Sequence, residues 1–135
     1  MKTKISFPLL ALAFLFSCQQ IQTAETNKIK KGMIKVAILY PNGEGKTFDM
    51  DYYSTKHMPL AAKLFGDSLV TMSIDKGLAS GNPEEPIPYL AIGYFYFKTM
   101  SAYQNTMVPH SPTLRADVPN YTNIQPVILV SEVVQ

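Results

Sequence analysis

The sequence has one cysteine, Cys18, and one arginine, Arg115, among its 135 residues. A single cysteine excludes an intramolecular disulfide, and its position near the N-terminus brings no thiolate chemistry to the rest of the chain. A single arginine provides no basic footprint of the kind that binds nucleic acid, so no nucleic-acid partner is expected. The sequence also lacks a glycine-rich phosphate loop between a strand and a helix, which argues against a nucleotide site.

The N-terminal segment has the pattern of a signal peptide. The basic residues 1–4 precede the apolar run 5–16, which is too short to span a membrane. The run ends in Leu-Phe-Ser-Cys at residues 15–18, which resembles a bacterial lipobox, in which the cysteine is lipidated and becomes the first residue. Cleavage at another position or an uncleaved anchor are the alternatives. The resemblance implies that Cys18 carries the lipid and, because Gln19 follows it, that the protein sits in the outer membrane of a Gram-negative cell, facing the periplasm.

The remaining chain divides into a tether and one domain. Lys2 and Lys4 leave with the signal peptide (residues 1–17), so 12 − 2 = 10 basic residues face 10 acidic ones and the mature chain is close to neutral. Residues 18–32 are polar and aperiodic, which predicts a flexible tether. The domain is expected over residues 33–135, with membrane contact only through the N-terminal lipid.

The domain has the hydrophobic periodicity of four strands and two helices. Asp49 is a plausible N-cap of the first helix, and Pro59 predicts a kink or break just after His57. Pro109 is expected to stop the second helix and Ser111-Pro112 to restart it. The expected elements, in chain order, are strand 33–40, helix 49–57 with a second segment 59–65, strand 67–79, strand 89–98, helix 99–107, and strand 125–134. This β-α-β-β-α-β order predicts an α+β, ferredoxin-like fold.

Both faces of the third strand are apolar or aromatic. In residues 89–98 the side chains of Leu90, Ile92, Tyr94 and Tyr96 alternate with those of Ala91, Gly93, Phe95 and Phe97. Two helices can cover only one face of a four-stranded sheet, so the second face needs another cover. A second copy related by two-fold symmetry is the simplest one, and a homodimer with two facing sheets is therefore expected.

Tyr53 and His57 are four residues apart and share one face of the first helix. Met50, Leu60 and Leu64 continue that face, so a proton-exchanging pair lies in an apolar stripe. The alternative is a core pair whose polar atoms are simply hydrogen-bonded.

The chain resembles the EthD family of dimeric α+β barrels over residues 33–134. The resemblance rests on the Met-Ile-Lys-Val start at residue 33, on Tyr52-Tyr53 with His57 and Pro59, and on the segment Ala-Asp-Val-Pro-Asn-Tyr-Thr at residues 116–122. It implies the ferredoxin-like fold and the dimer. It does not imply one activity, because related barrels include cofactor-free monooxygenases, isomerases and proteins without known chemistry.

The candidate site combines residues from distant segments. His57 is the expected general base or acid, Tyr53 a donor to a substrate oxygen, and Asp117 either the carboxylate that orients the imidazole or a cap of the following turn. Tyr121 is either a ligand contact or a packing residue. The other residues expected to contact the ligand are Tyr94, Phe95 and Tyr96.

Two functions remain open from the sequence. One is a cofactor-independent oxidoreductase or isomerase acting on a small aromatic or enolisable molecule in the barrel; the other is a non-catalytic, membrane-anchored ligand-binding or structural dimer. A cavity that reaches His57 favours the first. No cofactor is expected: His57, His110 and Asp117 match no metal-ligand spacing, nothing marks either histidine as a haem ligand, and His110 is expected at the surface or rim.

Overall fold

The structure is a computed structural model that describes residues 29–135. Its elements, in chain order, are β1 (Ile34–Pro41), α1 (Met50–Tyr52), the π-helical turn η1 (Tyr53–His57), α2 (Met58–Phe65), the short helix η2 (Gly66–Ser68), β2 (Leu69–Lys76), β3 (Tyr89–Phe97), α3 (Met100–Asp117), the short helix η3 (Val118–Asn120) and β4 (Val127–Glu132). The β-α-β-β-α-β order predicted from periodicity is confirmed. The proposed signal peptide, lipidation site and most of the tether lie outside the described residues.

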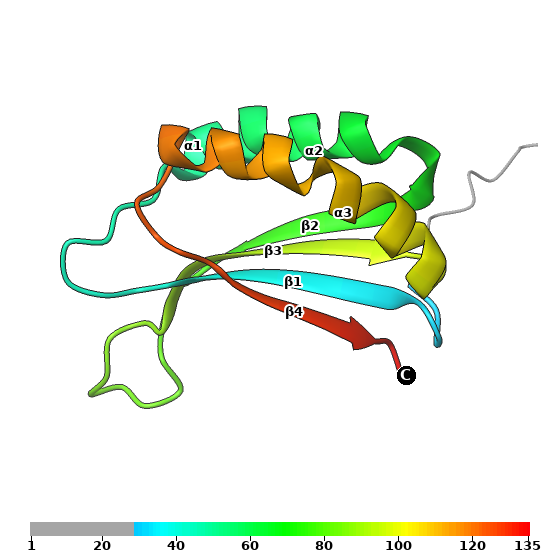
Figure 1. Cartoon of the computed structure of the whole chain (residues 1–135). Coiled ribbons are helices and arrows are strands. Elements are labelled where there is room, and N and C mark those ends of the chain that lie inside the picture. Colours follow the sequence, from blue (N-terminus) through cyan, green and yellow to red (C-terminus); the bar gives the residue numbers. More distant parts are fainter. Residues whose placement is uncertain (1–28) are drawn as a thin grey trace, which may run out of the picture.

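The four strands form one antiparallel sheet in the order β2-β3-β1-β4. The helical layer, made of α1, η1, α2 and α3, covers one face of this sheet (Figure 1). The central strands pair in register, with Val36 of β1 opposite Phe95 of β3 and Val130 of β4. This arrangement is the ferredoxin-like α+β fold that the sequence predicts.

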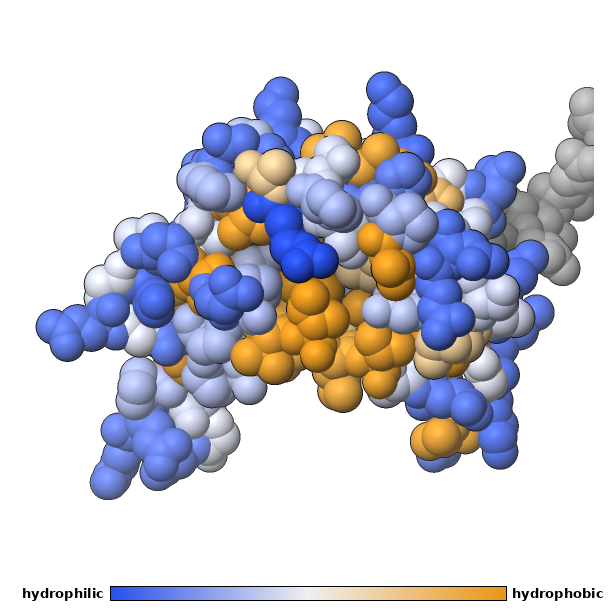
Figure 2. Space-filling model, in the orientation of Figure 1, coloured by the Kyte–Doolittle hydropathy of each residue, from blue (hydrophilic) through white to orange (hydrophobic). Residues whose placement is uncertain are grey.

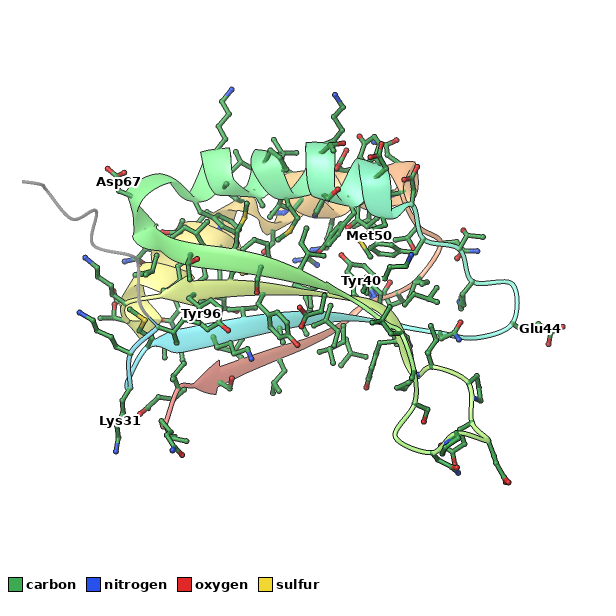
Figure 3. All side chains as sticks on the ribbon, turned by 180° about the vertical axis from the view of Figure 1, so that it is seen from behind. Lys31, Tyr40, Glu44, Met50, Asp67 and Tyr96 are labelled. Carbon is green, nitrogen blue, oxygen red and sulfur yellow. The ribbon has the colours of Figure 1, made fainter. Side chains whose placement is uncertain are left out.

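The core lies between the sheet and the helical layer. Alternate residues of β1 and β3 point into it, because successive side chains of a strand face opposite ways. Val36, Ala91 and Phe97 are fully buried there, and Ala61 of α2 allows the helix to approach the sheet closely. Figure 3 shows side chains filling this space, with Tyr40 between the strands and the helices.

The second sheet face carries apolar side chains, as the alternation in the third strand predicts, and no helix within residues 29–135 covers it. Its apolar members come from three strands: Ala37, Leu39, Ile92, Tyr94, Tyr96, Val127 and Leu129. The edge strand β4 is the most open part, and the side chain of Leu129 is 55% exposed. We call these seven residues the open sheet face.

The second helix differs from its predicted form. The stop at Pro109 and restart at Ser111 are wrong, because α3 runs without interruption from Met100 to Asp117 with Pro109 and Pro112 inside it. Each proline removes one backbone donor, but the carbonyls left without a partner belong to Asn105 and Val108, which are exposed and can bind water. The hydroxyl of Ser111 donates to the carbonyl of Met107 at 2.9 Å. Burial of the inner face of the helix against the sheet offsets the lost bonds. Thr99 is the N-cap, and its hydroxyl oxygen accepts from the backbone N–H of Ala102 at 3.1 Å.

Candidate active site

The first helical segment widens where Pro59 follows it. Asp49 caps α1 by accepting from the backbone N–H of Tyr52 at 2.9 Å, as predicted. Pro59 cannot donate to the carbonyl four residues before it, and the chain forms the π-turn η1 just ahead of it rather than breaking. The backbone of His57 stays helical (φ −64°, ψ −49°). The kink or break expected just after His57 is therefore replaced by a wider helical turn just before Met58. In this turn Tyr53 and His57 both point into the core.

Asp117, the last residue of α3, holds the imidazole of His57. Its Oδ2 atom lies 2.8 Å from Nδ1 of His57. The other carboxylate oxygen, Oδ1, accepts from the hydroxyl of Tyr52 at 2.9 Å and from the side-chain amide of Asn120 at 2.8 Å. Partial burial opposes ionisation of this carboxyl, but the hydrogen bonds from His57, Asn120 and Tyr52 outweigh it and hold the pKa of Asp117 below its ordinary value.

This contact fixes the roles of the two imidazole nitrogens. An ionised carboxylate can only accept hydrogen bonds. Nδ1 of His57 therefore carries the proton and donates a hydrogen bond to Asp117. In the neutral ring, Nε2 then presents its lone pair. The hydroxyl of Tyr121 lies 3.4 Å from Nε2, which is longer than an ordinary hydrogen bond. Nδ1 is thus held by a short hydrogen bond, and Nε2 has only a long contact and can accept a proton from a ligand, as a general base requires.

Three buried tyrosines, Tyr40, Tyr53 and Tyr121, lie around the Nε2 side of the His57 ring. The hydroxyls of Tyr40 and Tyr121 are 2.8 Å apart, and the ring of Tyr53 stacks on that of His57 with centroids separated by 5.4 Å. Burial is the largest cause that raises the pKa of each tyrosine above its ordinary value. These groups therefore stay protonated near neutral pH, and they act as hydrogen-bond donors rather than as bases.

A cavity of about 90 Å³ lies between the sheet and α3 and reaches His57. The aromatic side chains that line it are Tyr40, Tyr53, His57, Phe95 and Tyr121; its other walls are Ile38, Met107, Ser111, Leu114, Arg115, Val118, Pro126 and Ile128. Ile128, on β4, is 57% exposed, so the cavity opens beside this edge strand. Figure 2 shows apolar residues gathered in the middle of this face, below α3 and over β4.

The structure brings together some of the predicted site residues and separates others. His57, Tyr53, Phe95 and Tyr121 line the cavity, and Asp117 stands directly behind His57. Two of the expected ligand contacts, Tyr94 and Tyr96, lie on the open sheet face, where Nζ of Lys35 is 4.2 Å and 5.8 Å from the respective ring centroids. This cavity lies between the sheet and α3 of one chain, on the side of the sheet opposite Tyr94 and Tyr96. His110 is half-buried on α3 and does not line it.

Sequence reasoning did not assign three residues of this site: Tyr40, Tyr52 and Arg115. Tyr40 follows Val36 and Ile38 on the inward face of β1. The alternation of this strand is the sequence signal from which a buried hydroxyl at its end can be predicted. Tyr52 enters the sequence prediction only as a neighbour of Tyr53, yet its hydroxyl donates to Asp117. Nothing local in the sequence shows that Arg115 would reach the cavity.

Within residues 29–135, no three histidine, cysteine or acidic side chains lie close enough together to hold a metal ion. None of the helices in this part of the chain combines the length and the apolar character needed to cross a membrane.

The family model described as the EthD domain matches residues 42–125, which is more than half of the chain. The chain belongs to the EthD family. An EthD-like protein from Ralstonia eutropha JMP134 is 35% identical to it, with a TM-score of 0.72 over 78% of this chain and 96% of the other. An EthD family protein from Bacillus halodurans C-125 shares the fold at 19% identity, with a TM-score of 0.57 over 75% and 98% of the two chains. Comparison with curated proteins gave no match. The resemblance inferred from the sequence is confirmed, and the EthD domain has the fold of dimeric α+β barrel proteins.

The pKa of Asp117 predicts how the stability of this EthD domain depends on pH. Its folded-state pKa lies below the unfolded value, so the ionised carboxylate stabilises the fold at neutral pH and this contribution is lost as the pH falls through the lowered pKa. Asp117→Asn should therefore cost about 1–2 kcal/mol at pH 7, since charge-assisted hydrogen bonds are lost, and progressively less toward pH 3. Urea unfolding at several pH values measures the difference.

Glu44→Gln is the control for this experiment, because Glu44 is exposed and makes no ion pair within the described residues. Its effect should be small at every pH. A difference between wild type and Asp117→Asn that stays constant from pH 7 to pH 3 would contradict the role given to the carboxylate.

Proposed function

We propose that this EthD domain binds a small aromatic or enolisable molecule in the cavity beneath α3 and that His57 moves a proton on it without a cofactor. The observation that carries the proposal is an apolar cavity that ends at an imidazole whose other nitrogen is held by a carboxylate. Apolar pockets with a few convergent polar groups are the usual form of small-molecule sites. A cavity reaching His57 is also the feature that favours an enzyme over a packed structural core.

The chemistry begins with a carbon acid. Nε2 of His57 takes a proton from the carbon next to a carbonyl group, and the carboxylate of Asp117 stabilises the imidazolium that forms. The hydroxyl of Tyr121, close to Nε2, donates to the enolate oxygen. Return of the proton to a different carbon completes an isomerisation. With dioxygen as the oxidant, the enolate carbon instead gives its electron pair to dioxygen, a C–O bond forms, and the imidazolium of His57 returns its proton to the outer oxygen, so that a hydroperoxide is the product of an oxidoreductase reaction.

Proton transfer can be measured before the natural substrate is identified. The probes are cyclohexanone, acetophenone and α-angelica lactone in D2O, followed by proton NMR for exchange at the carbon next to the carbonyl. The proposal expects at least one probe to bind, by saturation transfer, and to exchange faster with protein than without it. Binding without faster exchange favours the alternative, a ligand-binding dimer without catalysis. Neither binding nor exchange by any probe would reject the proposed chemistry.

We further propose a homodimer that buries the open sheet face. Seven apolar or aromatic residues that no helix of the described part of the chain covers support this assembly, as does the dimeric α+β barrel fold. Light scattering of the domain from Lys31 onward should give twice the chain mass at low micromolar concentration. Leu129→Glu should yield the monomer mass, because it places a charge in the interface.

Val108→Glu is the matched control for this test. Val108 is 52% exposed, like Leu129, but it lies on α3, away from the open sheet face. This variant should remain a dimer. A stable, soluble wild-type monomer would rule out the assembly.

We propose lipid anchoring through Cys18 as the means by which the domain is held at the bacterial outer membrane. The support is the lipobox-like sequence at residues 15–18, together with Gln19 directly after the cysteine. Cys18→Ser should move the protein into the soluble fraction or leave the precursor uncut, as detergent-phase partitioning and intact mass would record. A mature N-terminus at another residue, with unchanged membrane association, would contradict the anchor.

A further inference from the structure

The only arginine of the chain stands at the cavity. Arg115 lies in the last turn of α3 and belongs to a stripe with Ser111, Leu114 and Val118, at the spacing of one helical face, and all four residues line the cavity. Its side chain is exposed, whereas His57 in the same cavity is 6% exposed. The cavity therefore has a cation at its solvent end and an imidazole at its buried end.

The guanidinium of Arg115 has no hydrogen-bonding or ionic partner in the described part of the chain. It makes no ion pair and no side-chain hydrogen bond with any residue of 29–135. The acidic residue nearest in sequence, Asp117, is already engaged by His57, Tyr52 and Asn120. The five donors of Arg115 are thus available to a ligand, and their planar fork matches a carboxylate group.

We propose that the ligand of this cavity is a small apolar carboxylate whose carboxylate group binds Arg115 while its apolar body lies against Leu114 and Ile128. This inference rests on the proposed function and names the substrate class for it. The carboxylate stays at the exposed rim, so the cost of removing a full charge from water is avoided. The aromatic or enolisable part enters the apolar cavity and meets Nε2 of His57.

Matched probes test the charge requirement directly. Benzoate and benzamide have nearly the same size and differ in charge, and their binding to the full domain at pH 7.5 and low salt is followed by methyl NMR. Benzoate should shift the methyl signals of Leu114 and Ile128 and bind roughly fivefold or more tightly than benzamide, a modest factor because the guanidinium is exposed. Arg115→Gln should abolish the preference, and Arg115→Lys should retain part of it.

Lys63→Gln is the matched control, because it removes one exposed positive charge from the neighbouring helix α2. It should leave the preference for benzoate unchanged. Equal binding of the two probes to wild type, at those methyl groups, would overturn the role of Arg115 while leaving the cavity and its proton transfer intact. Loss of the preference in Lys63→Gln would also overturn it, since the effect would then come from net charge. No shift at Leu114 or Ile128 with either probe would reject the inference together with the proposed binding site.

Discussion

Replacing Gly93 with alanine is expected to destabilise the fold by about 3 kcal/mol, the upper part of the range for overpacking a core. Gly93 lies in the middle of β3, opposite Ile38 of β1, and a Cβ atom there would overlap with the hydroxyl oxygen of Tyr53. Tyr53 is 1% exposed, and its rigid ring packs against the rings of Tyr40, Phe48 and His57, so moving the hydroxyl away from the new Cβ would disturb these contacts. Denaturant unfolding measures the loss.

A second substitution shows whether this contact is the cause. In a Tyr53→Phe background the overlapping oxygen is gone, and the next neighbour of the new Cβ is the ring carbon Cζ at 3.3 Å, which a small shift relieves. Gly93→Ala should then cost about 2 kcal/mol less than in the wild type, as a coupling between residues in contact. Gly81→Ala is the control, because a Cβ there would meet nothing within 4 Å. Equal costs of Gly93→Ala in the two backgrounds would show that the strand, not Tyr53, requires the glycine.

His57→Ala is expected to reduce proton exchange of the responsive probe by tenfold or more, which corresponds to about 1.4 kcal/mol of transition-state stabilisation. The fold should lose only about 1–2 kcal/mol. Asp117 keeps Tyr52 and Asn120 as donors after the imidazole is removed, and its side chain is 16% exposed, so water can replace the missing partner. Exchange kinetics and a denaturant melt of the same preparation give both values.

The second histidine of the domain serves as the control. His110→Ala removes an imidazole from α3 at a position outside the cavity, and both exchange and stability should stay near wild type. A loss of stability well above about 3 kcal/mol in His57→Ala would indicate that His57 is a structural core residue. Undiminished exchange in a folded His57→Ala domain would remove it from the chemistry.

The fold was predictable because its signals are local. The alternation in β1 and β3 and the caps Asp49 and Thr99 each follow from a few neighbouring residues. The error at Pro109 has a different origin. A proline weakens a helix locally, and only the tertiary packing of Met107 and Leu114 against the sheet shows that the helix continues.

The candidate site was predictable only in part, because local spacing does not show how distant segments pack together. The helical spacing of Tyr53 and His57 pointed to one surface, and the structure places both on the cavity. Asp117 is predicted as a partner of His57 because carboxylates often orient an imidazole, but its distance of 2.8 Å from the ring depends on how two helices cross. The position of the cavity between the sheet and α3, which puts Tyr94 outside it, depends on which sheet face the helices cover, and periodicity does not decide that.

The position of β1 in the sheet has a consequence for biosynthesis. β1 pairs on one side with β3 and on the other with β4, the last strand to be made, so Lys35 finds its partner Ser131 only after almost the whole domain has been translated. Until then one edge of β1 is bare, and such edges recruit other chains. The cavity also lacks the wall formed by Pro126 and Ile128. Shielding of the β1 edge and the capacity to hold a ligand therefore both depend on β4, and a chain truncated before β4 has neither.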